Sequence, residues 1–133
     1  MKKLILLISI LSLWACSTDK LDTEKGKAAV EILIRKIDRE EYKDLSPLYS
    51  DDFNAGESLE ARTEKFKKLR QALGEVQSLE LTEAKNEAVP GDESKLTLTY
   101  KIKRSRISSV ETFVVILEDG KYKVFDHSIR ADN

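Results

Sequence analysis

The single histidine of the chain, His127, has the most versatile acid–base chemistry in this sequence. A histidine inside a pocket can act as a general base, and a tyrosine or an acid beside it can complete the pair. If Phe125 and Ile129 face the core, His127 shares their face, because strand residues alternate. We weigh an isomerase- or hydratase-type site at His127 against a structural role of the imidazole in the core. The structural role is favoured.

Three tyrosines, Tyr42, Tyr49 and Tyr100, are the other candidate ligand-binding residues, because a hydroxyl facing a pocket can hold a ligand. The alternative for each is a core or rim ring whose hydroxyl reaches the surface, and we favour this alternative. Asp38 and Glu41 could place a carboxylate of raised pKa near the mouth of a pocket. The segment around them is charged throughout, which favours a solvated helix end.

A local basic cluster, made of Lys101, Lys103, Arg104 and Arg106, could face anionic lipid headgroups or an envelope polymer. Charged side chains on an exposed strand often serve only to block edge pairing, and we favour this interpretation. The sequence has no His/Cys cluster for zinc, no phosphate-binding glycine loop, no Gly-x-Ser-x-Gly motif and no calcium loop. We therefore expect no metal and no cofactor.

The only cysteine, Cys16, stands at the end of the only segment that is typical of a secretion signal. Lys2 and Lys3 precede an apolar run of eleven residues, 4–14, that contains two serines, and a polar stretch follows Cys16. A helix of that length is roughly 17 Å long, too short for a hydrocarbon core of about 30 Å. The pattern therefore predicts a signal peptide and no membrane-spanning helix.

Leu13, Trp14, Ala15 and Cys16 resemble the lipobox of bacterial lipoproteins, although Trp14 is bulkier than the residue usual at its position. The resemblance implies cleavage between Ala15 and Cys16, diacylglycerol on the Cys16 sulfur and acylation of the new amino terminus. Membrane lipid is then the partner of Cys16, and two or more acyl chains give stable attachment. Ser17 implies, by the same resemblance, the outer membrane facing the periplasm if the source is Gram-negative.

Length and composition indicate one globular domain behind this anchor, since the chain has 133 residues, 35% of them charged and 41% hydrophobic. The formal charge is −1, and removal of residues 1–15 with their two lysines leaves −3. That balance gives no reason to expect nucleic acid as a partner. We expect a signal peptide at 1–15, a lipidated cysteine and tether at 16–22, and one domain at 23–133.

Hydrophobic periodicity near 3.6 predicts helices in the first half of the domain. They cover residues 23–41, 40–50 and 58–73, with a loop at 50–57 from which Phe53 turns inward. Thr23 and Ser58 are the expected N-caps, and Pro47 shortens the second helix. Gly74 is expected to end the third helix through a left-handed conformation. The core-facing stripe of that helix is expected to be Leu59, Phe66, Leu69 and Leu73.

After Gly74 the hydrophobic period changes to 2, which predicts strands. They cover residues 76–88, 96–103, 110–117 and 121–130, with a turn at 90–92. The third strand is apolar almost throughout, as expected for a strand covered on both faces. Asp119-Gly120 predicts a type I′ hairpin turn. The apolar phase of the last strand shifts, which predicts a bulge near Val124 or Phe125.

The order of these elements resembles the nuclear transport factor 2-like, or cystatin-like, superfamily of α+β cones, and within it a bacterial branch of unknown function whose members are often lipoproteins. The resemblance covers most of residues 24–130 and is carried by residues 42–53, Phe66 to Gly74, Pro90-Gly91, Tyr100, Glu111 and 119–124. It implies a curved, mainly antiparallel four-stranded sheet wrapped over the first helix, with a conical pocket. Enzymes of the superfamily place an acid, a histidine or a tyrosine in that pocket.

We expect a cell-envelope lipoprotein that is not an enzyme and whose cone binds a small apolar ligand, a peptide or an envelope protein. One alternative is a small pocket enzyme of isomerase or hydratase type that uses His127. Another is a structural or accessory envelope protein without a pocket. Pocket volume separates this last class from the other two, and a His127 packed with no cavity beside it speaks against the enzyme.

Overall fold

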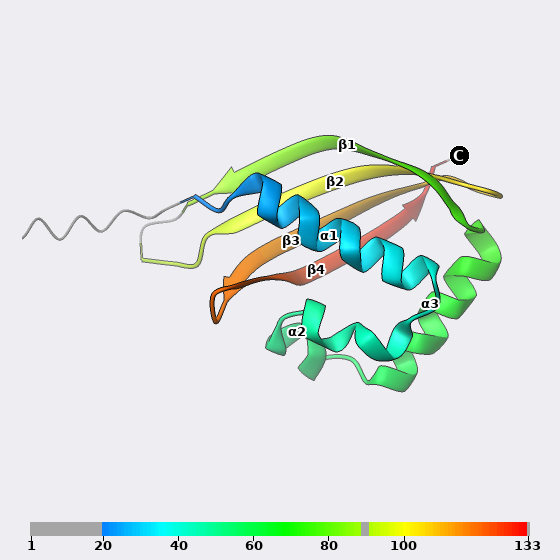
Figure 1. Ribbon diagram of the computed structural model, residues 1–133, viewed down its shortest axis with the longest axis horizontal. Helices are drawn as coiled ribbons and strands as arrows, with labels where there is room; N and C mark the ends of the chain where they lie inside the picture. The colour runs from blue at the N-terminus through cyan, green and yellow to red at the C-terminus, as the bar shows by residue number, and fades with distance from the viewer. Residues whose placement is uncertain (1–19, 89–90, 133) are drawn as a thin grey trace, which may run out of the picture.

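The computed structural model describes residues 20–88 and 91–132. The predicted signal peptide, lipobox and Cys16 lie outside this range, as does Pro90 of the predicted turn. The elements are α1 (Thr23–Asp38), the short 3₁₀ helices η1 (Tyr42–Asp44) and η2 (Ser46–Leu48), α2 (Asp51–Ala55), α3 (Leu59–Leu73), β1 (Val76–Glu87), β2 (Lys95–Arg104), β3 (Ser109–Glu118) and β4 (Lys121–Ala131). The predicted α+β class is confirmed (Figure 1).

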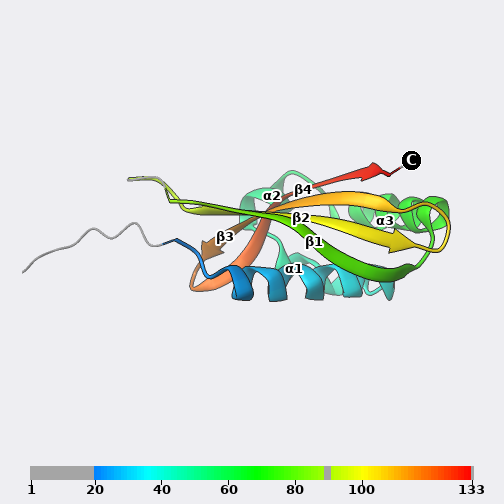
Figure 2. The ribbon, with the colours of Figure 1, turned by 90° about the horizontal axis from the view of Figure 1, so that it is seen from above.

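The four strands form one antiparallel sheet in the order β1-β2-β3-β4. The sheet is curved, and α1 lies along one of its faces (Figure 2). The short helix α2 lies beyond β4, and α3 leads from there to the start of β1 (Figure 1). The predicted cone-like arrangement is therefore confirmed.

The first helix is shorter than predicted at its carboxyl end and begins from a different cap. It ends at Asp38. Glu40 adopts a left-handed φ of 60°, which is incompatible with a right-handed helix. The N-cap is Asp22 rather than Thr23, and its carboxylate accepts from the amide nitrogens of residues 24 and 25. The predicted buried face is confirmed in its centre, where Val30, Leu33 and Ile34 are buried.

The segment 40–57 differs from its prediction. Instead of one short helix it contains η1 and η2, and Pro47 opens the second of them. The predicted loop holds the short helix α2, because Ser50 accepts from the Phe53 amide nitrogen as its N-cap. Two aspartates in its first turn favour this start further. The turn-forming residues Asn54 and Gly56 at the end of this segment are the reason that the sequence predicts a loop instead of a helix.

The third helix begins after its predicted N-cap, Ser58, and ends at Gly74, which has a φ of 86°. Its predicted stripe is wrong at Leu59, which is 43% exposed. Arg62, one turn further on, is buried in its place. A long arginine stem can pack like an aliphatic side chain, so a charged residue can occupy a core-facing position.

The predicted hairpin and bulge are both confirmed. Asp119 and Gly120 have φ values of 51° and 75°, as a type I′ turn requires. Phe125 is the extra residue of a bulge, because Val114 pairs with Asp126 and Val115 pairs with Val124. The bulge shifts the alternation of β4 by one position, so that Val124 before it and His127 and Ile129 after it all turn toward the core.

The prediction that residues 110–117 are covered on both faces is wrong. The strand β3 alternates between two environments over most of its length. Its inward positions are buried, namely Ser109, Glu111, Phe113 and Val115, and its outward positions are half-buried, namely Val110, Thr112 and Val114. Valine on the outward face made the segment look uniformly apolar, although valine is also common on half-exposed strands.

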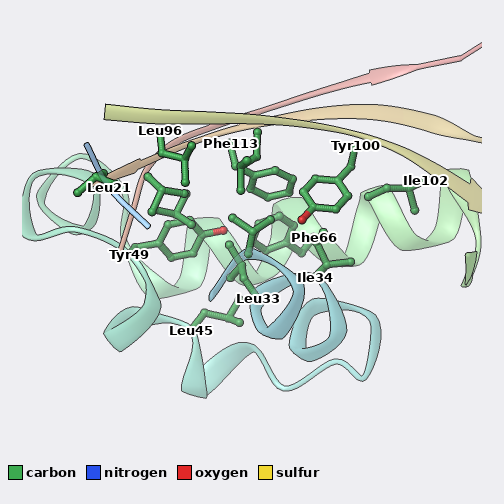
Figure 3. Packing of buried hydrophobic residues seen from close by; sticks show 14 of the residues in the cluster. Leu21, Leu33, Ile34, Leu45, Tyr49, Phe66, Leu96, Tyr100, Ile102 and Phe113 are labelled. Atoms are coloured by element: carbon green, nitrogen blue, oxygen red, sulfur yellow. The ribbon is translucent and has the colours of Figure 1, made fainter. Parts of the chain in front are cut away.

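The core fills the space between the sheet and the helices. Rings of Tyr49, Phe66, Tyr100 and Phe113 meet there, with leucines and isoleucines around them (Figure 3). Leu21, which precedes α1, is 9% exposed and belongs to the same hydrophobic cluster. The folded part of the chain therefore includes at least the last two residues of the segment that the sequence assigns to the tether.

Candidate functional site

His127 lies inside the cone, in the middle of a row of hydrogen-bonded side chains. Its side chain is 3% exposed. Nε2 lies 3.0 Å from Oε1 of Glu111, and Nδ1 lies 3.4 Å from the hydroxyl of Tyr49. Because the bulge at Phe125 shifts the alternation of β4, the imidazole points into the cone.

Glu111 connects His127 to a buried arginine. Its second oxygen, Oε2, accepts from Nη2 of Arg104 at 2.7 Å and from the Ser109 hydroxyl at 2.8 Å. Nε of Arg104 donates to the same hydroxyl at 3.0 Å. The Arg104 and Glu111 side chains are only 9% and 3% exposed. All three residues sit at inward positions of the neighbouring strands β2 and β3, so the sheet itself brings them together.

Protonation of this group follows from its contacts. Burial raises the pKa of the Glu111 carboxyl, but the hydrogen bond and charge of His127 and the charge of Arg104 outweigh burial and lower that pKa to about 2. An ionised carboxylate only accepts hydrogen bonds, so Nε2 of His127 carries a hydrogen. In the neutral form of His127, this tautomer leaves Nδ1 free to accept from the Tyr49 hydroxyl, whereas in the protonated form both ring nitrogens are donors.

Tyr49 is held from three sides. Its backbone forms an isolated parallel bridge with Val124 of β4, and its ring stacks on Phe53 at 4.4 Å between centroids. The guanidinium of Arg62 lies 4.3 Å from the ring centroid. Burial raises the pKa of the Tyr49 hydroxyl far above its ordinary value, so the hydroxyl stays protonated and can donate to His127.

Arg62 is the most unusual charged residue of α3, because its side chain is 1% exposed. Nε donates to Oε1 of Glu57 at 3.0 Å, and Lys65 contacts the other oxygen of Glu57 at 2.7 Å. Burial opposes ionisation of Glu57, but the hydrogen bonds from Lys65 and Arg62 prevail and lower its pKa. Nη2 of Arg62 has no hydrogen-bond partner in the part of the chain that the structure describes.

The interior of the cone has almost no free space. The cavity beside Glu111 and Arg104 has a volume of about 20 Å³, which is room for one water molecule. His127 lines none of the five best-formed hollows described over residues 20–88 and 91–132. Phe113 stacks on its imidazole at 4.1 Å, and Phe66 lies 6.1 Å away. These rings occupy the space that a substrate of His127 would need.

The hydroxyls of the other two tyrosines proposed as ligand contacts lie in the core without a hydrogen-bond partner in the described ranges. Tyr100 is fully buried and meets Phe113 edge to face at 6.0 Å. Tyr42 is 5% exposed and stacks on Phe66 at 6.4 Å. The structure thus brings Tyr49 to His127 and leaves Tyr42 and Tyr100 apart from it. A ligand-binding role for any of them stays a prediction.

The proposed basic cluster is not one surface patch. Arg104 turns inward to Glu111, and Arg106 donates to the backbone oxygen of Gln71 at 2.8 Å. Lys101 and Lys103 are exposed at outward positions of β2, where Lys101 lies 3.5 Å from Asp132. The four residues are close in sequence, but alternation along β2 turns Arg104 away from Lys101 and Lys103, and Arg106 lies beyond the end of the strand.

The two acids at the end of the first helix have structural partners. Asp38 accepts from the backbone nitrogen of Val76 at 3.0 Å and so joins the end of α1 to the start of β1. Glu41 lies 3.6 Å from Lys36. Within the described ranges, no group of three or more His, Cys, Asp or Glu side chains could hold a metal ion.

Sequence reasoning missed the three charged residues that surround His127 and Tyr49. Arg104 continues the inward series of β2, and Glu111 is in phase with Phe113 on β3. Arg62 stands one turn before Phe66 on the core face of α3. A charged residue in phase with a buried series is a usable signal, because such a residue must find a partner inside the fold.

An open groove of about 790 Å³ lies on the surface between residues 40–44 and the first turns of α3. Five carboxylates and two lysines line it. Leu59, the exposed leucine of α3, lies in this groove. The groove differs from the cone in being open to solvent and wide enough for a peptide side chain or a loop.

Comparison with known proteins supports the fold. No family model and no curated protein matches the sequence. A proposed dehydratase of the NTF2-like family from Streptomyces avermitilis superposes with a TM-score of 0.56 at 16% identity, over 84% of this chain and 96% of that one. An NTF2-like protein of unknown function from Silicibacter pomeroyi gives 0.53 at 15%, over 84% and 100%. At such identities the likeness shows an NTF2-like fold.

Proposed function

We propose that this protein is a lipid-anchored lipoprotein of the bacterial cell envelope, and that its domain is a binding or accessory module that works through its outer surface. The lipobox-like residues ending in Cys16 support the anchor. No helix among the described residues is long and apolar enough to cross a membrane. The partner is an envelope protein or peptide rather than a small apolar molecule held inside the cone.

The filled interior is the observation that carries this proposal. Sites for small molecules usually have about 300–1,000 Å³ of space. The cavity inside this cone has about 20 Å³. The buried row from Tyr49 through His127 to Glu111 connects the sheet to the segment before α2, and it therefore fits a role in holding the cone shut. The open groove along α3 is the surface most suited to a protein partner.

An enzyme that uses His127 is the second candidate. In its favour, Glu111 orients the imidazole and Tyr49 can exchange a proton with it, which is the geometry of an acid–base relay. One structural neighbour is also described as a proposed dehydratase. Against it, a general base must come within about 3 Å of its substrate, and His127 is enclosed by rings. Catalysis would need the cone to open.

Binding of an apolar fluorescent dye tests whether the cone is closed. We expect the native protein to bind no dye under conditions in which Phe113→Ala does, because that substitution leaves a cavity beside His127. Leu98→Ala is a second cavity variant if Phe113→Ala does not fold. Saturable binding of the dye by the wild-type protein, with cooperative unfolding retained, would show an open cone and favour the enzyme.

Mass spectrometry of the mature amino-terminal peptide tests the anchor. We expect Cys16 at its first position, with a diacylglycerol on the sulfur and an acyl group on the nitrogen. Cys16→Ser should leave an uncleaved precursor or a mislocalised protein. A free thiol at position 16 of the mature protein would reject the lipoprotein assignment.

A further inference from the structure

The backbone at Leu21 and Asp22 is fastened to both edge strands of the sheet. The Asn86 side chain on β1 accepts from the Leu21 nitrogen at 3.2 Å and donates to the Leu21 oxygen at 2.6 Å. The hydroxyl of Tyr122 on β4 accepts from the Asp22 nitrogen at 2.8 Å. We call these four residues, Leu21, Asp22, Asn86 and Tyr122, the terminal clamp.

The terminal clamp continues directly into α1, which fixes the direction in which the chain enters the fold. Asp22 is the N-cap of that helix, and Gly26 lies against Leu96 and Tyr122. A Cβ at position 26 would lie 2.3 Å from a methyl carbon of Leu96, so a larger residue there would have to displace this buried side chain. The first turn of α1 is therefore seated on the sheet at the same place where the clamp holds Leu21.

The chain before the clamp is short. Five peptide steps separate Cys16 from Leu21, and a fully extended chain of that length spans at most about 18 Å. The ten residues of β2 cover roughly 33 Å, by about 3.3 Å each. A lipid anchor at Cys16 could therefore reach only the end of the domain that carries the terminal clamp, and the far end would stay away from the bilayer.

The tip of the β3–β4 hairpin lies at this same end (Figure 1). Leu117 pairs with Tyr122 of the terminal clamp and is 44% exposed. Lys121 follows the turn and is exposed. A leucine with a lysine beside it suits the boundary between acyl chains and phosphate groups, because the ammonium can remain in the headgroup layer.

We propose that the hairpin tip, residues 117–121, is a membrane-docking surface, and that the terminal clamp orients the domain so that this surface rests on the lipid bilayer. This inference depends on the proposed lipidation of Cys16. Glu118 and Asp119 outweigh Lys121 and leave residues 117–121 with a charge of −1, so the anchor and Leu117, and not attraction to anionic lipid, hold the surface in place. The groove along α3 then faces away from the bilayer, toward an envelope partner.

Fluorescence quenching by labelled lipids tests the orientation. The acylated protein is placed in phosphatidylcholine vesicles that contain phosphatidylcholine with a nitroxide headgroup. Because Cys16 is the only cysteine and is blocked by lipid, Lys121→Cys and Ile107→Cys each provide a single thiol for the fluorophore. Ile107 is exposed in the turn between β2 and β3, at the other end of the sheet. We expect several-fold stronger quenching at position 121, unchanged at high salt.

Two variants test the clamp itself. Asn86→Ala combined with Tyr122→Phe should bring the quenching ratio of the two positions close to one, whereas Glu83→Ala, elsewhere on β1, should leave it unchanged. A flexible ten-residue insertion between Lys20 and Leu21 should also lower the ratio, and it leaves the fold intact if the double variant does not fold.

Equal quenching at positions 121 and 107 in the wild-type protein would overturn the inference, and so would a ratio that both the clamp variant and the insertion leave unchanged. Mass spectrometry of the same samples separates the two proposals. An unacylated Cys16 defeats the proposed function, whereas an acylated protein with equal quenching defeats only the orientation.

Discussion

Two ion pairs of this molecule have nearly the same length and very different surroundings. Arg104 and Glu111 meet at 2.7 Å inside the cone, with side chains 9% and 3% exposed. Lys85 and Glu87 meet at 2.8 Å on β1, with side chains 64% and 49% exposed. Distance is therefore no guide to their importance. An exposed pair can be released into water, whereas breaking the buried pair leaves a charge without water or partner.

The buried pair of Arg104 and Glu111, unlike the exposed pair, belongs to a larger hydrogen-bond network. Both oxygens of Glu111 have donors, and its partners come from β2, β3 and β4. Through His127 and Tyr49 the network continues to the segment before α2. The outer ion pair joins two residues of the same strand. We therefore expect the inner network to hold the sheet and the helical segment together, and the outer pair to have no such role.

The largest effect is expected from Glu111→Ala, which leaves Arg104 buried without its counter-charge. Removal of one partner of a buried pair costs about 3–5 kcal/mol in free energy of unfolding. Urea unfolding followed by circular dichroism measures this loss. The double variant Arg104→Met, Glu111→Leu should lose less than the single one, because no unpaired charge remains. Equal losses in the two variants would show that charge is not the reason.

Acid should weaken the inner network in the same way. The pKa of Glu111 in the folded protein is about 2, below its value in the unfolded chain. A depressed pKa contributes stability that is complete above the unfolded pKa and is lost as the pH falls through the folded one. We expect the free energy of unfolding to fall more steeply between pH 4.5 and 2 in the wild-type protein than in Glu111→Gln. Parallel curves would contradict the assignment.

A smaller loss is expected from His127→Phe, which keeps a ring against Phe113 and removes the hydrogen bonds to Glu111 and Tyr49. An unmade hydrogen bond to a buried group costs about 1–3 kcal/mol. Thermal unfolding at neutral pH measures it. His127→Ala, which also leaves a cavity, should lose more than His127→Phe. A phenylalanine variant more stable than the wild type would show that the hydrogen bonds do not contribute.

The smallest effect is expected from Lys85→Ala on the outer face. Its partner Glu87 remains solvated when the lysine is removed, so the urea midpoint should not change measurably. The same measurement on Lys101→Ala, whose partner is Asp132, extends the test to a second exposed pair. A clear loss at either position would remove the contrast between the two faces of the sheet.

Local signals were sufficient for much of this fold. Ser58 and Gly74 mark the two ends of α3, and Asp119-Gly120 forms the turn between β3 and β4. Each of these signals acts on backbone only a few residues away. The bulge at Phe125 was visible as a break in alternation. The start of α2 was not predicted, although Ser50 is a good N-cap, because the turn-forming residues after it favoured a loop.

The candidate site was predictable only in part. The position of His127 on the inner face of β4 follows from alternation and the bulge. Its partners do not, because Tyr49, Glu111 and Arg104 come from three other segments, and only the sheet register and the bridge between Tyr49 and Val124 bring them together. The same reason applies to the predicted basic cluster, because Arg104 points inward to the buried carboxylate of Glu111 and not outward beside Lys101 and Lys103. Whether the cone was open or filled depended on packing that no local pattern reports.

Chemical modification of His127 tests the closed cone most directly, because it is the only histidine in the chain. Diethyl pyrocarbonate reacts with accessible, neutral imidazole, and mass spectrometry of the peptide that contains His127 measures the product. We predict that the native protein resists modification at neutral pH and that reaction follows only after unfolding in urea. Rapid modification of the folded protein, with its circular dichroism unchanged, would contradict a closed cone and return His127 to the position of a catalytic candidate.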